Sequence, residues 1–377
     1  MFDNHKVALD TLVLDRGAVD LSFAQYKATR RFQSLDALRA FAIVAVIWHH
    51  TMATSFSSAI AYEGRYGVNL FFVISGFLIV TLLLRSQESP NGFSLAKFWG
   101  RRALRIFPIY FTVLAVYVLL VRYTDHSPAG VAFFQNLPYF ATFTSNWFVE
   151  PADRTIFVFS WSLATEEQFY LVWPLIEVLV PWRRVKLALL GLLIVTSQIA
   201  LAHVSDHWLD SYLPVRILAS AALGLLLGTG LAHGLNAEKS FGLAYRFIGH
   251  RGSAVGSVGF LVVSAIVSPE IGFAGDILMS VAFLLLVATT VVREDNDLAW
   301  ALRWQPIVWV GTVSYGMYML HMLSVNIVRR GMLVAHLEAS PTATFIGGTA
   351  VACGLATLSF LYYEKRFLTL KDRFFRD

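Results

Sequence analysis

Apolar stretches close to 20 residues long recur along this sequence from residue 37 to residue 363. A helix of that length crosses the hydrocarbon core of a bilayer, which is roughly 30 Å thick. Within that core every backbone polar group needs a partner inside the protein, so that only helices and closed barrels span it. The sequence therefore predicts an all-α, polytopic membrane helix bundle.

The composition agrees with a membrane location. Hydrophobic residues make up 56% of the chain and charged residues 15%, whereas a soluble domain carries about 25% charged residues. The isoelectric point near 9.3 does not indicate a nucleic-acid partner, because basic residues of membrane proteins gather in cytoplasmic loops. The sequence holds one cysteine, Cys353, which excludes an internal disulfide and a cysteine-based metal site. We expect no metal.

Eleven apolar windows are candidates for membrane spans: 37–56, 67–84, 103–121, 130–148, 160–181, 186–204, 214–234, 252–268, 273–292, 306–328 and 342–363. The window 130–148 is the weakest of them, because it carries Gln135, Asn136, Pro138 and Asn146. Whether this window spans decides the orientation of everything that follows it.

Cytoplasmic loops are enriched in Lys and Arg, which tests the weak window. If 130–148 does not span and the N-terminus is cytoplasmic, 24 Lys and Arg fall inside and 5 outside. If it spans, every later loop changes side. We therefore predict ten spanning helices, with an outer loop at 122–159 that holds a re-entrant or interfacial helix. Residues 1–34 and 364–377 are then cytoplasmic tails of one domain, 35–363.

The first window contains two ionisable side chains whose burial in lipid is costly, Arg39 and His50. They are eleven residues apart, about three helical turns, so both lie on one face, separated by roughly 16 Å along the axis. Ionisable groups inside spans are functional candidates, and a neutral imidazole is the usual general base near neutral pH. The structural alternative is that Arg39 extends to the lipid headgroups and His50 is a hydrogen-bonded interior residue.

A basic cluster opens the helix expected at 103–121. It contains Arg101, Arg102 and Arg105, which neighbour one another at helical spacings of three and four residues. Guanidinium groups grip phosphate oxygens in a bidentate manner, so this cluster is a candidate phosphate site. Contact with lipid headgroups is an equally ordinary use of such a cluster.

Two further windows carry polar groups. Glu166 and Glu167 lie within the stretch 159–174, and an ionised carboxylate there needs a histidine or arginine partner. The alternative is a carboxylate pair exposed at the membrane surface. The stretch 311–326 carries the secondary candidates Ser314, Tyr318 and His321, for which hydrogen bonding between helices is at least as good an explanation as catalysis.

Taken together, these stretches resemble the acyltransferase-3 family of membrane acyltransferases from about residue 33 to about residue 370. The family has an arginine, ten intervening residues and a histidine in its first helix, and Arg39 and His50 fit that spacing. Further matching segments occur in the family's order at 67–79, 101–110, 161–174, 314–321 and 363–367. One such segment alone is weak, but five in order are specific.

The resemblance implies transfer of an acyl group, usually acetyl, from cytoplasmic acyl-CoA to a hydroxyl of a carbohydrate or glycolipid, commonly a cell-surface glycan. It implies a multi-pass protein of the bacterial inner membrane. Members of the family often carry an extracellular SGNH hydrolase-like domain. We expect none here, because 14 residues follow the last window.

Residues and resemblance together yield a hypothesis for the site. Arg102 and Arg105 bind the phosphates of acetyl-CoA or another acyl-CoA, and Arg39 contacts the CoA head or the entrance for its arm. His50 is the general base, and Glu166 or Glu167 orients its ring. The alternative is a secondary transporter in which His50, Glu167 and Arg216 relay protons. A non-catalytic membrane sensor would leave the carboxylates unexplained.

Overall fold

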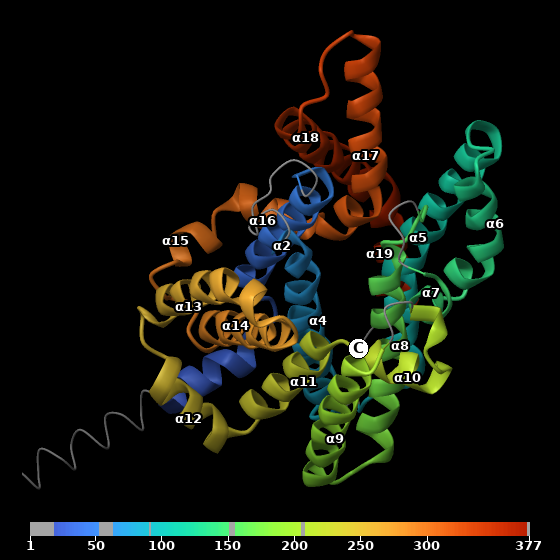
Figure 1. The fold of residues 1–377 in the computed structure, drawn as a ribbon. Coiled ribbons are helices and arrows are strands. Elements are labelled where there is room, and N and C mark those ends of the chain that lie inside the picture. The colour runs from blue at the N-terminus through green and yellow to red at the C-terminus, as the bar shows by residue number, and fades with distance from the viewer. Residues whose placement is uncertain (1–18, 53–62, 90–91, 151–154, 205–207, 375–377) are drawn as a thin grey trace, which may run out of the picture.

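The computed structural model describes residues 19–52, 63–89, 92–150, 155–204 and 208–374. All regular structure in these residues is helical, as predicted. Residues 19–28 are helical, and the chain continues through α2 (Gln33–Met52), η1 (Glu63–Tyr66), α4 (Gly67–Gln87), α5 (Leu95–Thr124), α6 (Pro128–Ala141), α7 (Ser145–Phe148), α8 (Ser160–Leu179) and α9 (Arg183–Ala202). Figure 1 shows α2 and α4 at the centre of the bundle.

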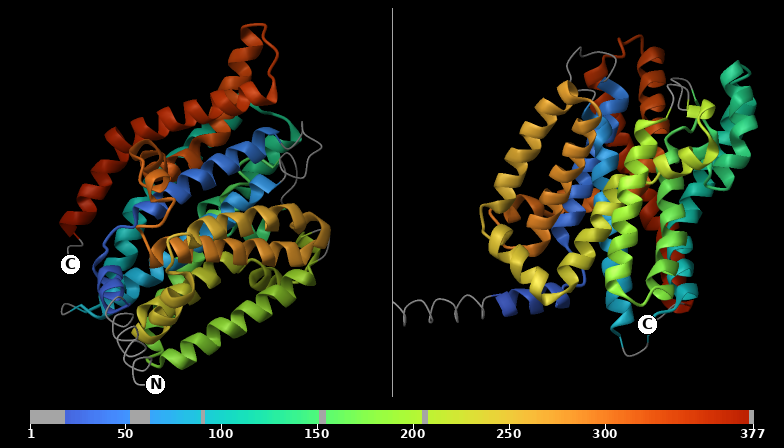
Figure 2. Two further views of the ribbon diagram at one scale, coloured as in Figure 1. Left: turned by 90° about the vertical axis from the view of Figure 1, so that its left-hand side faces the viewer. Right: turned by 60° about the horizontal axis from the view of Figure 1, so that its bottom comes forward.

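The second half of the chain wraps around this centre, and Figure 2 shows its long helices running beside α2 and α4. Its elements are η2 (Trp208–Asp210), α10 (Leu213–Ala219), α11 (Leu223–Asn236), α12 (Glu238–Ile248), α13 (Ser253–Val267), η3 (Ser268–Ile271), α14 (Phe273–Val292), α15 (Ala299–Leu302), α16 (Gln305–Thr312), α17 (Ser314–Val334), α18 (Pro341–Ser359), a π-helical turn (Phe360–Glu364) and α19 (Lys365–Phe374). The predicted C-terminal tail is therefore helical as far as Phe374.

Six helical segments of the described residues are long and apolar enough to cross a membrane, and the bent pair α10–α11 adds a seventh if it counts as one span. Three more helices, α2, α8 and α17, have 20, 20 and 21 residues. They carry the ionisable side chains discussed below, which lowers their hydropathy. The chain is a multi-pass membrane protein, while the count of ten spans stays a prediction.

The weak window 130–148 forms two short helices, α6 and α7, of 14 and 4 residues. Neither has the roughly 20 residues of a span, in agreement with the prediction for this window. The helix α6 folds back against α5, where the Tyr110 hydroxyl donates a hydrogen bond to the Phe140 carbonyl at 2.7 Å.

Two predicted spans are wrong as single helices. The window 214–234 breaks between α10 and α11, whose axes differ by 50°. The window 306–328 divides at Val313 into α16 and α17. Here the reason is a close approach: a Cβ atom at Gly311 would lie 1.7 Å from the Asp36 carbonyl oxygen, so α16 runs directly against α2 before the chain turns.

A second close helix pair in the centre is α4 with α11. A Cβ atom on Gly228 of α11 would lie 2.2 Å from the Val73 carbonyl oxygen of α4, so only glycine permits this approach. Small residues at helix crossings are a main device of membrane-helix packing, because they let two backbones come together. This contact holds α4, which lines the candidate site, at the centre of the bundle.

The substitution Gly228→Ala is expected to destabilise the protein, because the added methyl group forces α4 and α11 apart. Overpacking of this kind costs about 1–3 kcal/mol. Gly234→Ala is a matched control on the same helix, since nothing lies within 4 Å of the position that its Cβ atom would take. Thermal unfolding in detergent should show a lower midpoint for Gly228→Ala alone, and equal midpoints for the two variants would contradict the packing argument.

The far end of α8 is anchored by a buried ionic cluster. One carboxylate oxygen of Glu177 lies 2.6 Å from Lys186 Nζ, and the other lies 2.8 Å from His233 Nε2 and accepts from Trp173 Nε1 at 3.0 Å. The Glu177 side chain has no exposed surface. A buried charge is tolerated only when it is paired in this way, so the cluster ties α8, α9 and α11 together.

Candidate active site

Two adjoining cavities run into the bundle from the ends of α2 and α4 where Arg31 and Arg85 lie. The wider one, about 410 Å³, we call the arginine mouth; the deeper one, about 90 Å³, we call the inner cavity. Both are lined by Arg39, Ser75, Arg102, Arg105, Tyr170, Thr312 and Tyr315, so they form one passage.

The arginine mouth gathers six guanidinium groups from four separate stretches of chain: Arg30, Arg31, Arg39, Arg85, Arg102 and Arg105. Its acidic lining residues are Asp36 and Glu364. Asp36 is already paired, with Arg31 at 2.7 Å and Arg39 at 3.4 Å. The mouth therefore carries a large excess of positive charge for an anionic ligand.

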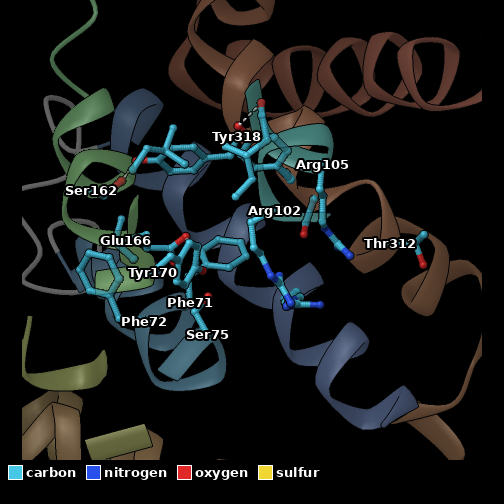
Figure 3. A pocket seen from close by; sticks show the side chains of 16 residues that line it. Phe71, Phe72, Ser75, Arg102, Arg105, Ser162, Glu166, Tyr170, Thr312 and Tyr318 are labelled. Carbon is cyan, nitrogen blue, oxygen red and sulfur yellow. Dashed lines mark hydrogen bonds between the residues drawn. The ribbon is translucent and has the colours of Figure 1, made fainter. Parts of the chain in front are cut away.

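Arg102 and Arg105 project from α5 into this passage (Figure 3). Within the described residues neither makes an ion pair with a carboxylate, and the neighbours of Arg102 are the rings of Phe98 and Tyr170. Their charges are thus available to a ligand. Arg101, on the same helix, does not line either cavity.

One face of α8 forms a wall of the inner cavity. Ser162, Glu166 and Tyr170 follow one another at intervals of four residues and all line it (Figure 3). The Tyr170 hydroxyl donates to Glu166 at 3.1 Å. Glu167 is turned by roughly 100° from this face, and its Oε1 atom is buried without a hydrogen-bond partner in the described part of the chain. Glu166 therefore lines the cavity and Glu167 does not, a difference that the sequence alone did not show.

The first turns of α17 close the deep end of the passage. Ser314 and Tyr318 both line it. The hydroxyls of Tyr318 and Ser162 are hydrogen-bonded at 2.6 Å, and the Tyr318 hydroxyl also donates to the Phe159 carbonyl at 2.9 Å. Tyr318 is thereby held rigidly at the point where α8 and α17 meet.

His321 lies one turn beyond Tyr318 and is completely buried. Its Nδ1 atom lies 2.5 Å from the Tyr318 carbonyl oxygen. A carbonyl only accepts, so Nδ1 carries the proton and Nε2 of the neutral ring is left as an acceptor. Nε2 has no partner in the residues that the structure describes.

His50 faces this histidine from α2, with the two ring centroids 5.0 Å apart. Among the described residues, the ring of His49 also lies beside it, at 5.3 Å. The contacts of the described residues thus bring His50 to His321, whereas Glu166 contacts Tyr170 instead. A carboxylate partner for His50 stays a prediction.

The structure adds residues that sequence reasoning missed. Ser162 and Tyr170 share a helical stripe with Glu166, and the four-residue spacing was the available signal. No local signal existed for Arg31 and Arg85, because tertiary packing alone brings them to the mouth. Arg216 contacts the Trp147 carbonyl at 2.6 Å and the Phe148 ring, which gives the proton-relay alternative no support.

The sequence profile of one known family, described as an acyltransferase domain, matches residues 32–363. The matched residues include most of the helices that line the two cavities, and they include the two histidines that face each other. The chain belongs to the acyltransferase-3 family. The family resemblance drawn from the sequence is thereby confirmed, and the passage described above lies inside an acyltransferase domain.

Relatives of this acyltransferase cover most of its length. YrhL of Bacillus subtilis, provisionally named a peptidoglycan O-acetyltransferase, is 30% identical over 92% of this chain and 56% of its own. The peptidoglycan O-acetyltransferase OatA of Listeria monocytogenes is 28% identical over 76% of this chain and 48% of its own. The O-acetyltransferase OatA of Staphylococcus aureus is 28% identical over 78% and 50%. This acyltransferase therefore spans about half the length of these curated relatives. No solved structure shows a significant match.

Proposed function

We propose that this acyltransferase is an O-acetyltransferase that moves an acetyl group from cytoplasmic acyl-CoA to a hydroxyl of a carbohydrate or glycolipid, such as a cell-surface glycan. The observation that carries the proposal is a passage that leads from six arginines to Tyr318, one helical turn from His321, whose ring faces that of His50. Such a passage fits a thioester donor whose anionic head stays in the arginine mouth and whose reactive end enters the inner cavity.

The arginine mouth suits the phosphates of CoA. Arg102 and Arg105 reach into it with charges that no described carboxylate neutralises, and guanidinium forks bind phosphate oxygens through charge-assisted hydrogen bonds. Arg39 lines both cavities, where it contacts the CoA head or the start of the pantetheine arm. The narrower inner cavity admits the thin arm and excludes the bulky nucleotide.

His50 acts as the general base of the transfer. It takes the proton of the acceptor hydroxyl while the hydroxyl oxygen attacks the carbonyl carbon of the thioester. The carbon–sulfur bond breaks, and the CoA thiolate leaves and receives the proton. The imidazolium that forms needs an acceptor to orient and stabilise it, as the acid does in a catalytic triad. Glu166 or Glu167 was predicted for that role, and His321 Nε2 is a second acceptor beside the ring.

The acceptor class rests on the relatives, two of which bear the name peptidoglycan O-acetyltransferase. We propose the inner membrane as the location, with both termini cytoplasmic, because the arginine mouth then faces the cytosol and the cytoplasmic acyl-CoA. This orientation agrees with the excess of Lys and Arg in the loops predicted to lie inside.

The proposal is tested with the full chain in nanodiscs. We expect saturable binding of CoA, and we expect cells that express the gene to carry surface glycans heavier by one acetyl group than cells that lack it. Mass spectrometry of the glycans measures the second effect. Glycans of equal mass, or a purified chain without affinity for CoA, would contradict the proposal.

His321→Ala is expected to lower the rate of acetyl transfer while leaving the affinity for CoA unchanged, because His321 orients His50 and does not line the mouth. His321→Gln, which retains an acceptor, should recover part of the activity. Turnover is measured with labelled acetyl-CoA and compared over a range of pH. Unchanged turnover in His321→Ala would assign the orienting role to a carboxylate.

A further inference from the structure

A third cavity, which we call the outer cavity, lies at the opposite end of α4 from the arginine mouth. Its lining includes Val68 and Phe72 of the first turns of α4, whereas the mouth is lined by the last turns, as far as Arg85. The interval from Val68 to Arg85 corresponds to roughly 25 Å along a helix. The two openings are therefore on opposite sides of the spanning bundle.

The outer cavity combines aromatic faces with hydrogen-bonding groups. Tyr66, Phe72, Trp161 and Trp208 supply the rings, and Asn69, Asn146, Gln198, Arg65 and Asp276 supply the polar groups. An aliphatic lipid tail needs no such polar groups, and a simple ion needs no such rings. The mixture fits a pyranose ring, which has a C–H face for an aromatic side chain and hydroxyls around its rim.

Asp276 is prepared to accept hydrogen bonds in this cavity. The Tyr66 hydroxyl and Arg65 both donate to its Oδ1 atom, at 2.5 and 3.1 Å. The second oxygen, Oδ2, makes no hydrogen bond with a described residue, and the side chain is 39% exposed. A carboxylate held by one oxygen presents the other to the hydroxyls of a sugar.

A donor is also available. The indole Nε1 atom of Trp208 is buried and has no hydrogen-bond partner in the described part of the protein. Leaving a buried donor unpaired costs about 1–3 kcal/mol. Trp208 lines the outer cavity, so this unpaired donor belongs to the wall of that cavity.

The broken helix lines the same cavity. Residues 219–224, which include the bend between α10 and α11, contribute to its wall. Irregular backbone at membrane depth is tolerated where it lines a cavity, and broken helices mark substrate sites in other membrane proteins. The break that the sequence did not predict thus has a place in a binding site.

The outer cavity ends where the inner cavity begins. Val68 and Phe72 line both, and the consecutive residues Trp161 and Ser162 line one each. Phe72 and Trp161 meet edge to face, with ring centroids 6.0 Å apart. The helix α2, which carries His50, is also near, because a Cβ atom at Gly64, beside Arg65, would lie 2.9 Å from His49 Cβ.

We infer that the outer cavity is the acceptor site, which binds a sugar ring between Trp161, Trp208 and Asp276, and that the Phe72–Trp161 pair separates it from the donor passage. This inference rests on the proposed function. Donor and acceptor then approach from opposite sides of the membrane, and the acetyl group passes from the donor passage to the sugar in the outer cavity. The aromatic pair keeps water in the outer cavity away from the thioester. A bound sugar then takes the place of that water.

The test uses the full chain in nanodiscs with chitotetraose and maltotetraose as neutral sugar probes. We expect saturable binding of at least one probe by the unmodified chain. Asp276→Asn, which keeps the shape and removes the charge, should weaken that binding about tenfold. Trp161→Ala should weaken it as well and, without any sugar, should increase hydrolysis of acetyl-CoA to acetate and CoA, because water enters in place of the acceptor.

CoA binding is measured on the same samples and separates the two proposals. Both variants should bind CoA as the unmodified chain does, and Trp300→Leu, at a site 81% exposed, should change neither sugar binding nor hydrolysis. A chain that binds CoA but neither sugar, or equal sugar affinity in Asp276→Asn and the unmodified chain, overturns the acceptor site and leaves the donor proposal standing. A chain that binds a sugar but not CoA overturns the donor proposal and leaves the acceptor site standing.

Discussion

Replacement of His50 by alanine is expected to lower acetyl transfer by about 100- to 10,000-fold, the contribution usual for a general base. Without the imidazole, the acceptor hydroxyl attacks the thioester with its proton still in place. The affinity for acetyl-CoA should stay unchanged, because His50 lies beyond the cavities that the arginines line. Turnover with labelled acetyl-CoA and binding of CoA are measured on the same purified protein.

His50→Gln serves as the stricter variant, since it keeps a polar side chain of similar length and removes only the basicity. It should be as slow as the alanine variant. His203→Ala, at an exposed histidine on the end of α9, is the matched control and should retain full turnover. Turnover of His50→Ala at the rate of the unmodified protein would remove His50 from the mechanism.

The double substitution of Arg102 and Arg105 by alanine is expected to weaken CoA binding by about 100-fold or more. Each charge-assisted hydrogen bond to a phosphate contributes about 1.5–3 kcal/mol, and two of them are lost. Isothermal titration with CoA measures the loss. Titration with pantetheine, which has the arm without the nucleotide phosphates, should show no such difference between the variant and the unmodified protein.

Arg184→Ala is the control for total charge, because Arg184 is exposed on α9 and lies outside both cavities. It should bind CoA with unchanged affinity. If the Arg102/Arg105 variant lost affinity for pantetheine and CoA equally, the arginines would act through the packing of α5. If it kept full affinity for CoA, the arginine mouth would not be the donor site.

Much of the fold followed from local properties of the sequence. The window 273–292 is the helix α14 to the residue, and the polar window 130–148 is not a span. The first result depends on apolar length, and the second depends on the polar residues of the window and on the distribution of Lys and Arg between the loops. The breaks at 220–222 and at Val313 escaped prediction, because neither a proline nor a charge marks them and the close approaches beside them involve distant residues such as Asp36 and Asn69.

The sequence predicted most of the individual residues of the site, but it did not predict how they lie relative to one another. Arg39, Arg102, Arg105, Glu166, Ser314 and Tyr318 all line the inner cavity. Arg39 and Glu166 were found because an ionisable group inside an apolar helix is costly. Arg102 and Arg105 were found as a basic cluster suited to phosphate, and Ser314 and Tyr318 only as secondary candidates. The partner of His50 was not found in this way, since the choice between Glu166, Glu167 and His321 depends on which helix faces α2.

The amino-acid sequence alone determined a helical membrane protein of the acyltransferase-3 family, because apolar length, charge bias and motif order are properties of the linear chain. Only the tertiary structure decided that six arginines from distant segments share one mouth, that Glu166 rather than Glu167 lines the passage, and that His321 faces His50. These relations depend on helix rotation and crossing, which are set by contacts such as Gly228 against Val73. Such contacts join residues far apart in the chain, so no local pattern encodes them.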